Sequence, residues 1–202
     1  VHDGEGIRTT VFFKGCPLKC VWCHNPEGLK FEPQLMVSDN GCLKCGKCSD
    51  ICKHLENCTA CGECIRACPL RLRKITGTRM TSDELVSELL RDRDYLMACG
   101  GGVTFSGGEP TAQPVFLLEC LKKLTSMHRA IETSGYCEPH MFSQILKELD
   151  FVIMDIKMVD TKKHEYYTGV GNQVILQNLK QLKESGKPFW IRIPVIPGVN
   201  DS

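Results

Sequence analysis

The sequence predicts an α/β fold, namely a partial parallel (β/α) barrel of the TIM-like kind with a small α+β unit inserted near its start. Two observations predict the barrel. Short apolar stretches alternate with amphipathic ones after residue 75, and polar motifs follow directly after the apolar stretches. This alternation indicates parallel strands joined by right-handed helical crossovers. A third observation predicts the insert, because residues 31–74 are rich in cysteine and break the alternation.

These boundaries assign residues 1–30 and 75–202 to the barrel and residues 31–74 to the insert. The chain has 202 residues, of which 42% are hydrophobic, and this is enough for one substantial core and a small appended unit. The sequence begins without Met and stops just after a Pro-Gly turn, so we expect it to be truncated at both ends.

Charge and hydropathy exclude several classes of partner. The formal net charge is +1, which does not suggest a nucleic-acid-binding surface. No apolar run approaches the roughly 20 residues that cross a bilayer, and the N-terminus lacks the pattern of a signal peptide. We therefore expect a cytoplasmic protein that binds neither nucleic acid nor membrane.

Cysteine content is the most informative part of the composition. The chain contains 14 cysteines, which in an exported protein would suggest a disulfide framework. The sequence carries no export signal, and all but three of the cysteines fall into tight clusters with short, fixed gaps. Such gaps are typical of metal ligands. We therefore expect bound metal rather than disulfides.

The first cysteine motif follows the first predicted strand. Residues 7–14 are rich in β-branched and aromatic side chains and end at Gly15, which predicts a strand and then a loop. That loop carries Cys16, Cys20 and Cys23 in a C-x3-C-x2-C pattern. Three thiolates cannot complete the four-thiolate shell of a cubane iron-sulfur cluster. One iron of such a cluster would therefore stay open to another ligand.

The insert repeats a second cysteine pattern, C-x2-C-x2-C-x3-C, twice. This is the rhythm of bacterial ferredoxins with two [4Fe-4S] clusters, in which the fourth cysteine of each run ligates the other cluster. By that rule one cluster takes Cys42, Cys45, Cys48 and Cys68, and the other takes Cys58, Cys61, Cys64 and Cys52. Two zinc sites are the alternative. Two departures bear on the crossed assignment: Lys53 stands where Pro is usual, and five residues separate Cys52 from Cys58.

The remaining elements follow in order after the insert. Thr81 and Glu84 form the sequence of a capping box, which predicts a helix from there to about Met97. Strands are then expected at residues 103–105, 130–133, 151–157 and 189–194. Helices are expected at residues 114–127, 138–149, 161–167 and 173–185.

Polar residues come at or just past the end of each predicted strand. They are the three-cysteine loop, Ser106 to Glu109, Glu132 to Ser134, Asp155 with Lys157, and Arg192. In parallel α/β barrels the chemistry gathers at the carboxyl ends of the strands, so we expect one shared site.

An open iron beside glycines suggests a small ligand that carries an amine and a carboxylate. Gly107 and Gly108 would let the backbone approach this ligand closely. Glu109 could accept a hydrogen bond from its ammonium group, and Lys157 could either offset its carboxylate or pair with Asp155.

These motifs resemble those of the radical S-adenosylmethionine (SAM) superfamily. The resemblance rests on Cys16, Cys20 and Cys23 with Trp22, followed by Gly107-Gly108-Glu109. Further motifs resemble glycyl-radical-enzyme activating enzymes of the subgroup that carries a two-cluster ferredoxin insert. These motifs are residues 2–9, 14–18, 22–27, 155–157 and 192–198.

The resemblance implies a reaction and a set of ligands. Cys16, Cys20 and Cys23 would hold a [4Fe-4S] cluster whose open iron binds the amino and carboxylate groups of SAM. Reductive cleavage of SAM would give a 5′-deoxyadenosyl radical, which takes a hydrogen atom from a backbone glycine of a partner glycyl radical enzyme.

The resemblance also implies which residues contact SAM. Gly107, Gly108 and Glu109 would hold its amino end, and Trp22 would lie near the adenine. Thr133, Asp155 and Lys157 would hold its carboxylate and ribose side. A further SAM contact would come from a sixth strand beyond this sequence.

The insert would relay electrons from a flavodoxin or ferredoxin to the SAM cluster. Its basic side chains outnumber its acidic ones, and this excess could attract an acidic donor or simply balance the charge of the clusters. The basic residues are Lys44, Lys47, Lys53, Arg66, Arg71, Arg73 and Lys74, and the acidic ones are Asp50, Glu56 and Glu63.

Several residues have simpler interpretations. Cys99, Cys120 and Cys137 are expected to be packed thiols, His2 and Asp3 a structural pair, and His24 a group that orients the cysteine loop. Two functional alternatives remain: a radical SAM enzyme with another peptide or small-molecule target, and an iron-sulfur electron-transfer module without catalysis.

Overall fold

The computed structural model describes residues 3–52 and 57–201, which form two compact units. The barrel unit comprises residues 1–29 and 80–202, and the insert unit comprises residues 30–79. The predicted boundary between residues 74 and 75 falls inside β3 (Arg73–Thr76). This strand pairs with β2 (Gln34–Val37), so both strands belong to the insert unit.

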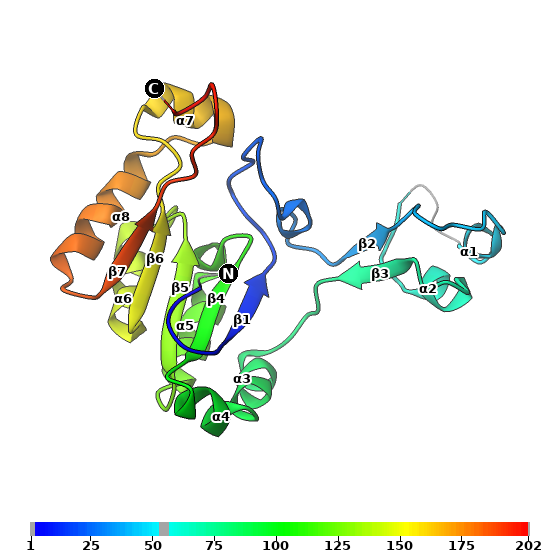
Figure 1. Cartoon of the computed structure of the whole chain (residues 1–202), viewed down its shortest axis with the longest axis horizontal. Helices are drawn as coiled ribbons and strands as arrows, with labels where there is room; N and C mark the ends of the chain where they lie inside the picture. Colours follow the sequence, from blue (N-terminus) through cyan, green and yellow to red (C-terminus); the bar gives the residue numbers. More distant parts are fainter. Residues whose placement is uncertain (1–2, 53–56, 202) are drawn as a thin grey trace. The chain divides into compact units, whose positions relative to one another are not determined.

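The barrel unit is built on one parallel sheet of five strands (Figure 1). The strand order is β1 (Arg8–Phe13), β4 (Gly102–Gly107), β5 (His128–Thr133), β6 (Phe151–Asp155) and β7 (Phe189–Arg192). Each strand pairs in parallel with the next, and the register places Phe13 opposite Gly107 and Asp155 opposite Arg192. The predicted parallel α/β fold is confirmed. All five strands end at the same edge of the sheet.

Helices connect these strands. They are α3 (Ser82–Leu90), α4 (Arg93–Ala98), α5 (Pro114–Lys123), α6 (Pro139–Glu148), α7 (Thr161–Thr168) and α8 (Gln173–Glu184). All of them except α7 pack on one face of the sheet, and α7 lies beyond the carboxyl ends of the strands (Figure 1). Two short 3-10 turns, η1 (Pro26–Gly28) and η2 (Pro110–Ala112), lie in the loops after β1 and β4.

The single helix predicted from Thr81 to about Met97 is wrong, because the structure divides it into α3 and α4. The predicted capping box is present at Thr81 and Glu84. The division has a packing reason. In a continuous helix, Arg93 would follow Leu89 on the buried face. The break between α3 and α4 leaves Arg93 exposed, while Leu96 still reaches the core, where it is 3% exposed.

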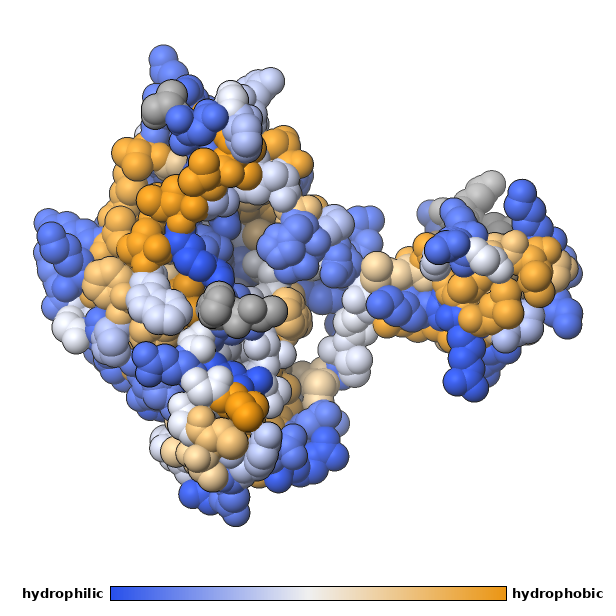
Figure 2. Space-filling view, viewed as in Figure 1, coloured by the Kyte–Doolittle hydropathy of each residue, from blue (hydrophilic) through white to orange (hydrophobic). Residues whose placement is uncertain are grey.

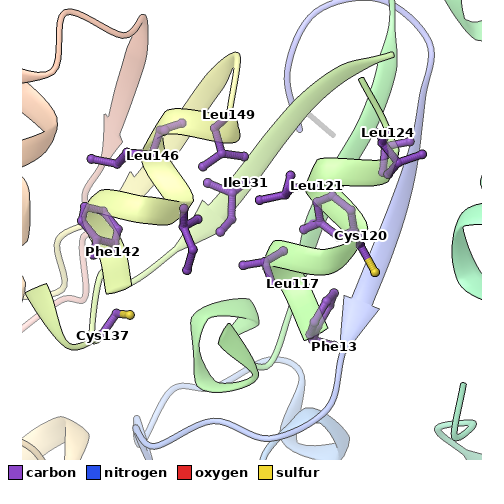
Figure 3. Packing of buried hydrophobic residues seen from close by; sticks show 14 of the residues in the cluster. Phe13, Leu117, Cys120, Leu121, Leu124, Ile131, Cys137, Phe142, Leu146 and Leu149 are labelled. Atoms are coloured by element: carbon purple, nitrogen blue, oxygen red, sulfur yellow. The ribbon is translucent and has the colours of Figure 1, made fainter. Parts of the chain in front are cut away.

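The hydrophobic core lies between the sheet and its helices. Leu117 and Leu121 of α5 and Phe142 of α6 lie around Ile131 of β5, and all four are fully buried (Figure 3). Burying a side chain of this size contributes about 1.5–3 kcal/mol. This packing fixes the positions of β4, β5 and β6, and therefore of the residues at their carboxyl ends.

Two of the three isolated cysteines belong to this core. Cys120 and Cys137 are buried in the same cluster, as expected for packed thiols. Cys99, at the end of α4, is only partly buried.

The insert unit combines the β2–β3 hairpin with two short helices. The strands are antiparallel, and the helices are α1 (Lys47–Asp50) and α2 (Glu63–Ala67). Each helix begins after a glycine in the left-handed region, Gly46 with φ 77° and Gly62 with φ 85°. Lys53 lies outside the described residues. Among the described residues, no helix has both the length and the apolar character that crossing a membrane requires.

Candidate active site

A cavity of about 630 Å³ lies at the carboxyl ends of the parallel strands. It is lined by all ten barrel residues for which the sequence suggests a site role, namely Cys16, Cys20, Trp22, Cys23, Gly107, Gly108, Glu109, Thr133, Asp155 and Lys157. Further lining residues at the strand ends are Phe12, Ser106, Glu132, Ser134 and Arg192. The structure therefore brings together, around one space, residues that lie up to 191 positions apart in the sequence, from Asp3 to Pro194.

The cysteine loop, residues 14–29, is fixed by backbone hydrogen bonds within the barrel unit. The N–H groups of Gly15 and Cys16 donate to the carbonyls of Gly28 and Leu29, at 2.8 and 3.1 Å. The Glu109 N–H, just past β4, donates to the Gly15 carbonyl at 2.8 Å. These bonds close the loop on itself and fasten it to the neighbouring strand end.

Helix α7 anchors the same loop from another direction. The Lys19 and Val21 N–H groups donate to the carbonyls of Thr168 and Tyr167, at 2.7 and 3.1 Å. The Thr168 hydroxyl donates to the His164 carbonyl at 2.8 Å, and both side chains are buried. The last turn of α7 therefore positions the stretch between Cys16 and Cys23. The sequence reasoning missed this anchor, for which the i, i+4 spacing of His164 and Thr168 was the only local signal.

The thiols of the loop sit in a partly buried environment that disfavours free thiolates. Burial, together with the charge of Glu109, raises the pKa of Cys16 to about 12. Burial also raises the pKa of Cys20, although the nearby Lys157 ammonium opposes the shift. Because metal ligation requires thiolates, a bound metal group must displace these protons and supply the compensating positive charge.

Gly107 and Gly108 are required by the packing of the chain itself. Gly107 has φ 110°, and a Cβ there would lie 2.4 Å from the Phe13 nitrogen. A Cβ on Gly108 would lie 2.5 Å from the carbonyl oxygens of both Gly15 and Gly28. These glycines therefore let β4 approach β1 and the cysteine loop, in addition to lining the cavity.

The Glu109 carboxylate is buried, at 1% exposure, and accepts five hydrogen bonds. Its Oε1 accepts from the Thr111 N–H and hydroxyl and from the Thr133 hydroxyl, at 3.1, 2.8 and 2.6 Å. Its Oε2 accepts from the Ser134 N–H and hydroxyl, at 2.8 and 2.6 Å. A carboxylate offers about four lone-pair sites. Glu109 therefore joins the ends of β4 and β5, and a substrate ammonium would compete with donors already in place.

A chain of alternating charges crosses the ends of β5, β6 and β7. The Arg192 guanidinium lies 2.8 Å from Glu132 and donates to Asp155 at 2.9 Å. Lys157 donates to the other oxygen of Asp155, also at 2.9 Å. Burial lowers the pKa of Arg192, but the charges of Asp155 and Glu132 outweigh it and raise the pKa overall. Of the two roles suggested for Lys157, the structure shows the pairing with Asp155.

Aromatic and polar side chains complete the wall around the cysteines. The ring of Trp22 lies 5.9 Å from that of Tyr167 on α7, which holds the indole beside the cavity. His24 also lines the cavity. Asp3 lines it too, and accepts a hydrogen bond from the Thr10 hydroxyl at 3.0 Å. His2, the expected partner of Asp3, lies outside the described residues.

The insert unit contains two cavities among its described residues, each lined by four cysteines. The larger cavity, of about 240 Å³, is lined by Cys42, Cys45, Cys48 and Cys68. The smaller, of about 20 Å³, is lined by Cys52, Cys58, Cys61 and Cys64. Each run of cysteines thus contributes three side chains to one cavity and one to the other.

Hydrogen-bond donors face several of the insert sulfurs. The Lys44 and Ala60 N–H groups donate to the sulfurs of Cys42 and Cys58, both at 3.4 Å. Backbone N–H donors, led by Leu72, hold the pKa of Cys68 below its usual value. Donors of this kind stabilise thiolates and the anionic clusters that thiolates bind.

Comparison with known proteins identifies the family. The radical SAM superfamily matches residues 10–202. The chain is 40% identical to the 4-hydroxyphenylacetate decarboxylase activating enzyme of Clostridium scatologenes, over 100% of this chain and 72% of that protein. It is 41% identical to the trans-4-hydroxy-L-proline dehydratase activating enzyme of Clostridioides difficile, over 99% of this chain and 72% of that protein.

A solved structure shares the fold. The crystal structure of Streptococcus suis SuiB bound to the precursor peptide SuiA matches 92% of this chain and 32% of that chain, with a TM-score of 0.53 and 15% identity. Together, the cavity at the strand ends and these matches show that the chain belongs to the radical SAM superfamily and, within it, to the activating enzymes of glycyl radical enzymes.

Proposed function

We propose that this chain cleaves SAM reductively and uses the resulting 5′-deoxyadenosyl radical to take a hydrogen atom from a backbone glycine of a partner glycyl radical enzyme. One observation carries the proposal. In a chain of this family, the three-cysteine loop and the polar strand ends surround a single cavity. The [4Fe-4S] cluster that this family binds would be held by Cys16, Cys20 and Cys23, and when bound it supplies the electron for the cleavage.

The cavity offers groups suited to each part of SAM. Lys157 and Arg192 provide positive charge for its carboxylate, and Trp22 provides an aromatic face for its adenine. Asp155 lies between the two cations, where one of its oxygens could accept from the ribose. Gly107 and Gly108 line the amino end. Glu109 and Thr133 bond to each other, so their contribution is to hold the strand ends in place.

The insert is proposed to hold two further [4Fe-4S] clusters with the crossed ligand sets. Two findings support this. The two cysteine cavities contain the four ligands that the crossed assignment requires. In addition, each thiolate of a cubane binds its own iron, so the sulfurs do not converge on one point. Two zinc sites are the alternative, and the iron content of the protein distinguishes the two.

These clusters would relay electrons from a flavodoxin or ferredoxin to the SAM cluster. The proposed location is the cytoplasm, since thiols and low-potential clusters persist in a reducing compartment. All 14 cysteines lie within the described residues, and each is a free thiol there.

Transfer of the radical to a partner tests the proposed function. The protein purified anaerobically from its own host would be reduced, given SAM, and mixed with the two glycyl radical enzymes whose activators are its relatives, the decarboxylase and the dehydratase. A third candidate partner is any protein with a C-terminal glycyl-radical loop that proves to be encoded beside its gene. We expect the electron paramagnetic resonance signal of a glycyl radical with at least one of them, and none with Cys16→Ser. Formation of 5′-deoxyadenosine without a glycyl radical on any partner would contradict the proposed target.

A further inference from the structure

The two cysteine runs of the insert form halves with the same backbone and different side chains. We call residues 42–52 the first half and residues 58–68 the second half. Sixteen positions separate equivalent residues, as Cys42 and Cys58 show. Lys44 and Ala60 are equivalent and share an unusual left-handed conformation, with φ 52° and 53°. Both also donate an N–H to a cysteine sulfur at the same distance, 3.4 Å.

The equivalent side chains differ at several positions, although not all in one direction, since Asp50 of the first half is equivalent to Arg66 of the second and Ser49 to Ile65. The first half presents Leu43 and Lys44, and the second half presents Thr59 and Ala60 at the same positions. Leu43 is 68% exposed, and Lys44 is exposed as well. The first residue of α1 is the exposed Lys47, whereas the first residue of α2 is Glu63. At these three positions the first half thus presents an exposed leucine and two exposed lysines where the second half has Thr59, Ala60 and Glu63.

The surroundings of the two halves reinforce this difference. In the second half, Arg66 forms an ion pair with Glu63, which neutralises the charge of α2. Ile75 of β3 lies against the second half, 3.6 Å from where a Cβ on Gly62 would be. Around Gly46 of the first half, a Cβ would meet only the side chain of Asp50. Leu70 and Arg71 are also exposed, and Leu70 lines the cavity of Cys42, Cys45, Cys48 and Cys68. Figure 2 shows apolar side chains gathered on this unit.

We propose that the first half is the docking surface for an electron-carrier protein with an acidic face, and that the cluster of Cys42, Cys45, Cys48 and Cys68 receives the electron first. The inference rests on the proposed function, in which the insert holds clusters. An exposed leucine flanked by lysines matches a carrier with an apolar redox site inside an acidic rim. In the transfer, the carrier loses one electron and this cluster gains one, with no bond formed or broken.

Balancing the cluster charge does not account for the difference between the halves. Each half supplies three thiolates to one cavity and one to the other, so both need the same compensation. Apart from the cysteines, the first half carries a formal charge of +1 from Lys44, Lys47 and Asp50, and the second half carries 0 from Glu63 and Arg66. Lys44 and Lys47 are both exposed, where they can meet a partner.

The internal repeat provides matched variants for a test. Lys44→Ala with Lys47→Glu gives the first half the residues of the second at these two positions, and Ala60→Lys with Glu63→Lys does the reverse. The left-handed conformation accepts either residue at positions 44 and 60, as both occur there. Each anaerobically purified protein would be mixed in a stopped-flow instrument with a reduced acidic flavodoxin, and bleaching of the clusters would be followed at several ionic strengths.

The first double variant should be reduced by flavodoxin about tenfold more slowly at low salt, with a weaker salt dependence. Its reduction by dithionite should be unchanged, which shows intact clusters. The second double variant should keep at least the rate of the original protein. Equal flavodoxin rates in the original and the first variant would overturn the docking surface, as would a loss confined to the second. Failure of the underlying function is distinct, since a protein without insert clusters would contain about four irons rather than about twelve.

Discussion

Glu109 illustrates how one buried side chain can set the geometry of the candidate active site. Its carboxylate lies between the ends of β4 and β5 and accepts from Thr111, Thr133 and Ser134. The sequence motif suggested that Glu109 contacts a ligand. Its hydrogen bonds with Thr133 and Ser134 join residues 24 and 25 positions away, so no local pattern predicts them. At the residue scale, much of the polarity of this site serves to hold the strand ends together.

Replacing Glu109 with Gln should therefore destabilise the chain. The glutamine amide would place its own NH2 group opposite hydrogen-bond donors of Thr111, Thr133 or Ser134, and the charge-assisted bonds would be lost. We therefore expect the free energy of unfolding to fall by about 2–3 kcal/mol. Anaerobic urea denaturation measures this difference. Glu165→Gln is the control, because Glu165 lies exposed on α7 and should change stability by less than about 0.5 kcal/mol. Equal stabilities for the two variants would refute the bridging role.

The core thiols predict how stability depends on pH. Burial raises the pKa of Cys120 and of Cys137 from 9.0 to about 11. Between these values the folded chain keeps protons that the unfolded chain releases, so both contributions are complete below about pH 9 and are lost as the pH rises towards about 11. Melting temperatures measured from pH 8 to about 11 should fall, and less steeply after Cys120→Ala with Cys137→Ala. The same slope in both proteins would contradict this assignment.

At the scale of elements, α7 matters as a support for the cysteine loop. Its last carbonyls accept the Lys19 and Val21 N–H groups, and its own last turn is held by the buried Thr168 and His164. The His164 Nδ1 contacts the Val170 carbonyl oxygen at 2.7 Å. Because these buried contacts fix the last turn of α7, the hydrogen bonds from Lys19 and Val21 fix the cysteine loop as well.

Thr168→Val should loosen this support without changing the size of the side chain. Loss of a buried hydroxyl bond costs about 1 kcal/mol, which corresponds to roughly fivefold faster local opening. Hydrogen-deuterium exchange with mass spectrometry should show faster exchange at the amides of residues 19 and 21. Tyr166→Phe is the control, because Tyr166 is 79% exposed. Unchanged exchange in Thr168→Val would show that α7 does not position the loop.

The elements also show what a sequence can and cannot predict. The five strands and the cavity at their ends followed from local patterns, because parallel strands joined by crossovers must end at one edge. The division of the helix after Leu90 keeps Arg93 exposed, and this depends on how the helix packs rather than on a local pattern. The bond between Lys19 and Thr168 joins residues far apart in sequence, and no local pattern encodes it. Likewise, the close packing of Gly107 and Gly108 depends on the position of β1 and the cysteine loop, which no local pattern predicts.

At the scale of the whole molecule, the proposed function divides the chemistry between the two units, with SAM cleavage in the barrel unit and electron supply in the insert unit. Cys16 belongs to the cavity of the barrel unit, and Cys58 belongs to the smaller cysteine cavity of the insert. We therefore expect substitutions of these two cysteines to impair different steps, namely SAM cleavage itself and the supply of electrons for it.

Single substitutions should separate the two roles. Cys16→Ser removes a proposed ligand of the SAM-binding cluster, so cleavage of SAM should stop with any reductant. Cys58→Ser should slow cleavage driven by reduced flavodoxin by about tenfold or more, and leave cleavage driven by a small chemical reductant largely intact. Chromatography of 5′-deoxyadenosine under both conditions gives the comparison. Loss of both activities in Cys58→Ser would argue against a relay.

Formation of 5′-deoxyadenosine is the measurement that tests the central claim most directly. The protein is purified anaerobically from its own host, its iron content is confirmed, and it is reduced in the presence of SAM. The account predicts that 5′-deoxyadenosine and methionine accumulate together, and that neither forms with Cys16→Ser. A protein with its full complement of iron that binds SAM, accepts electrons and yields no 5′-deoxyadenosine would contradict it.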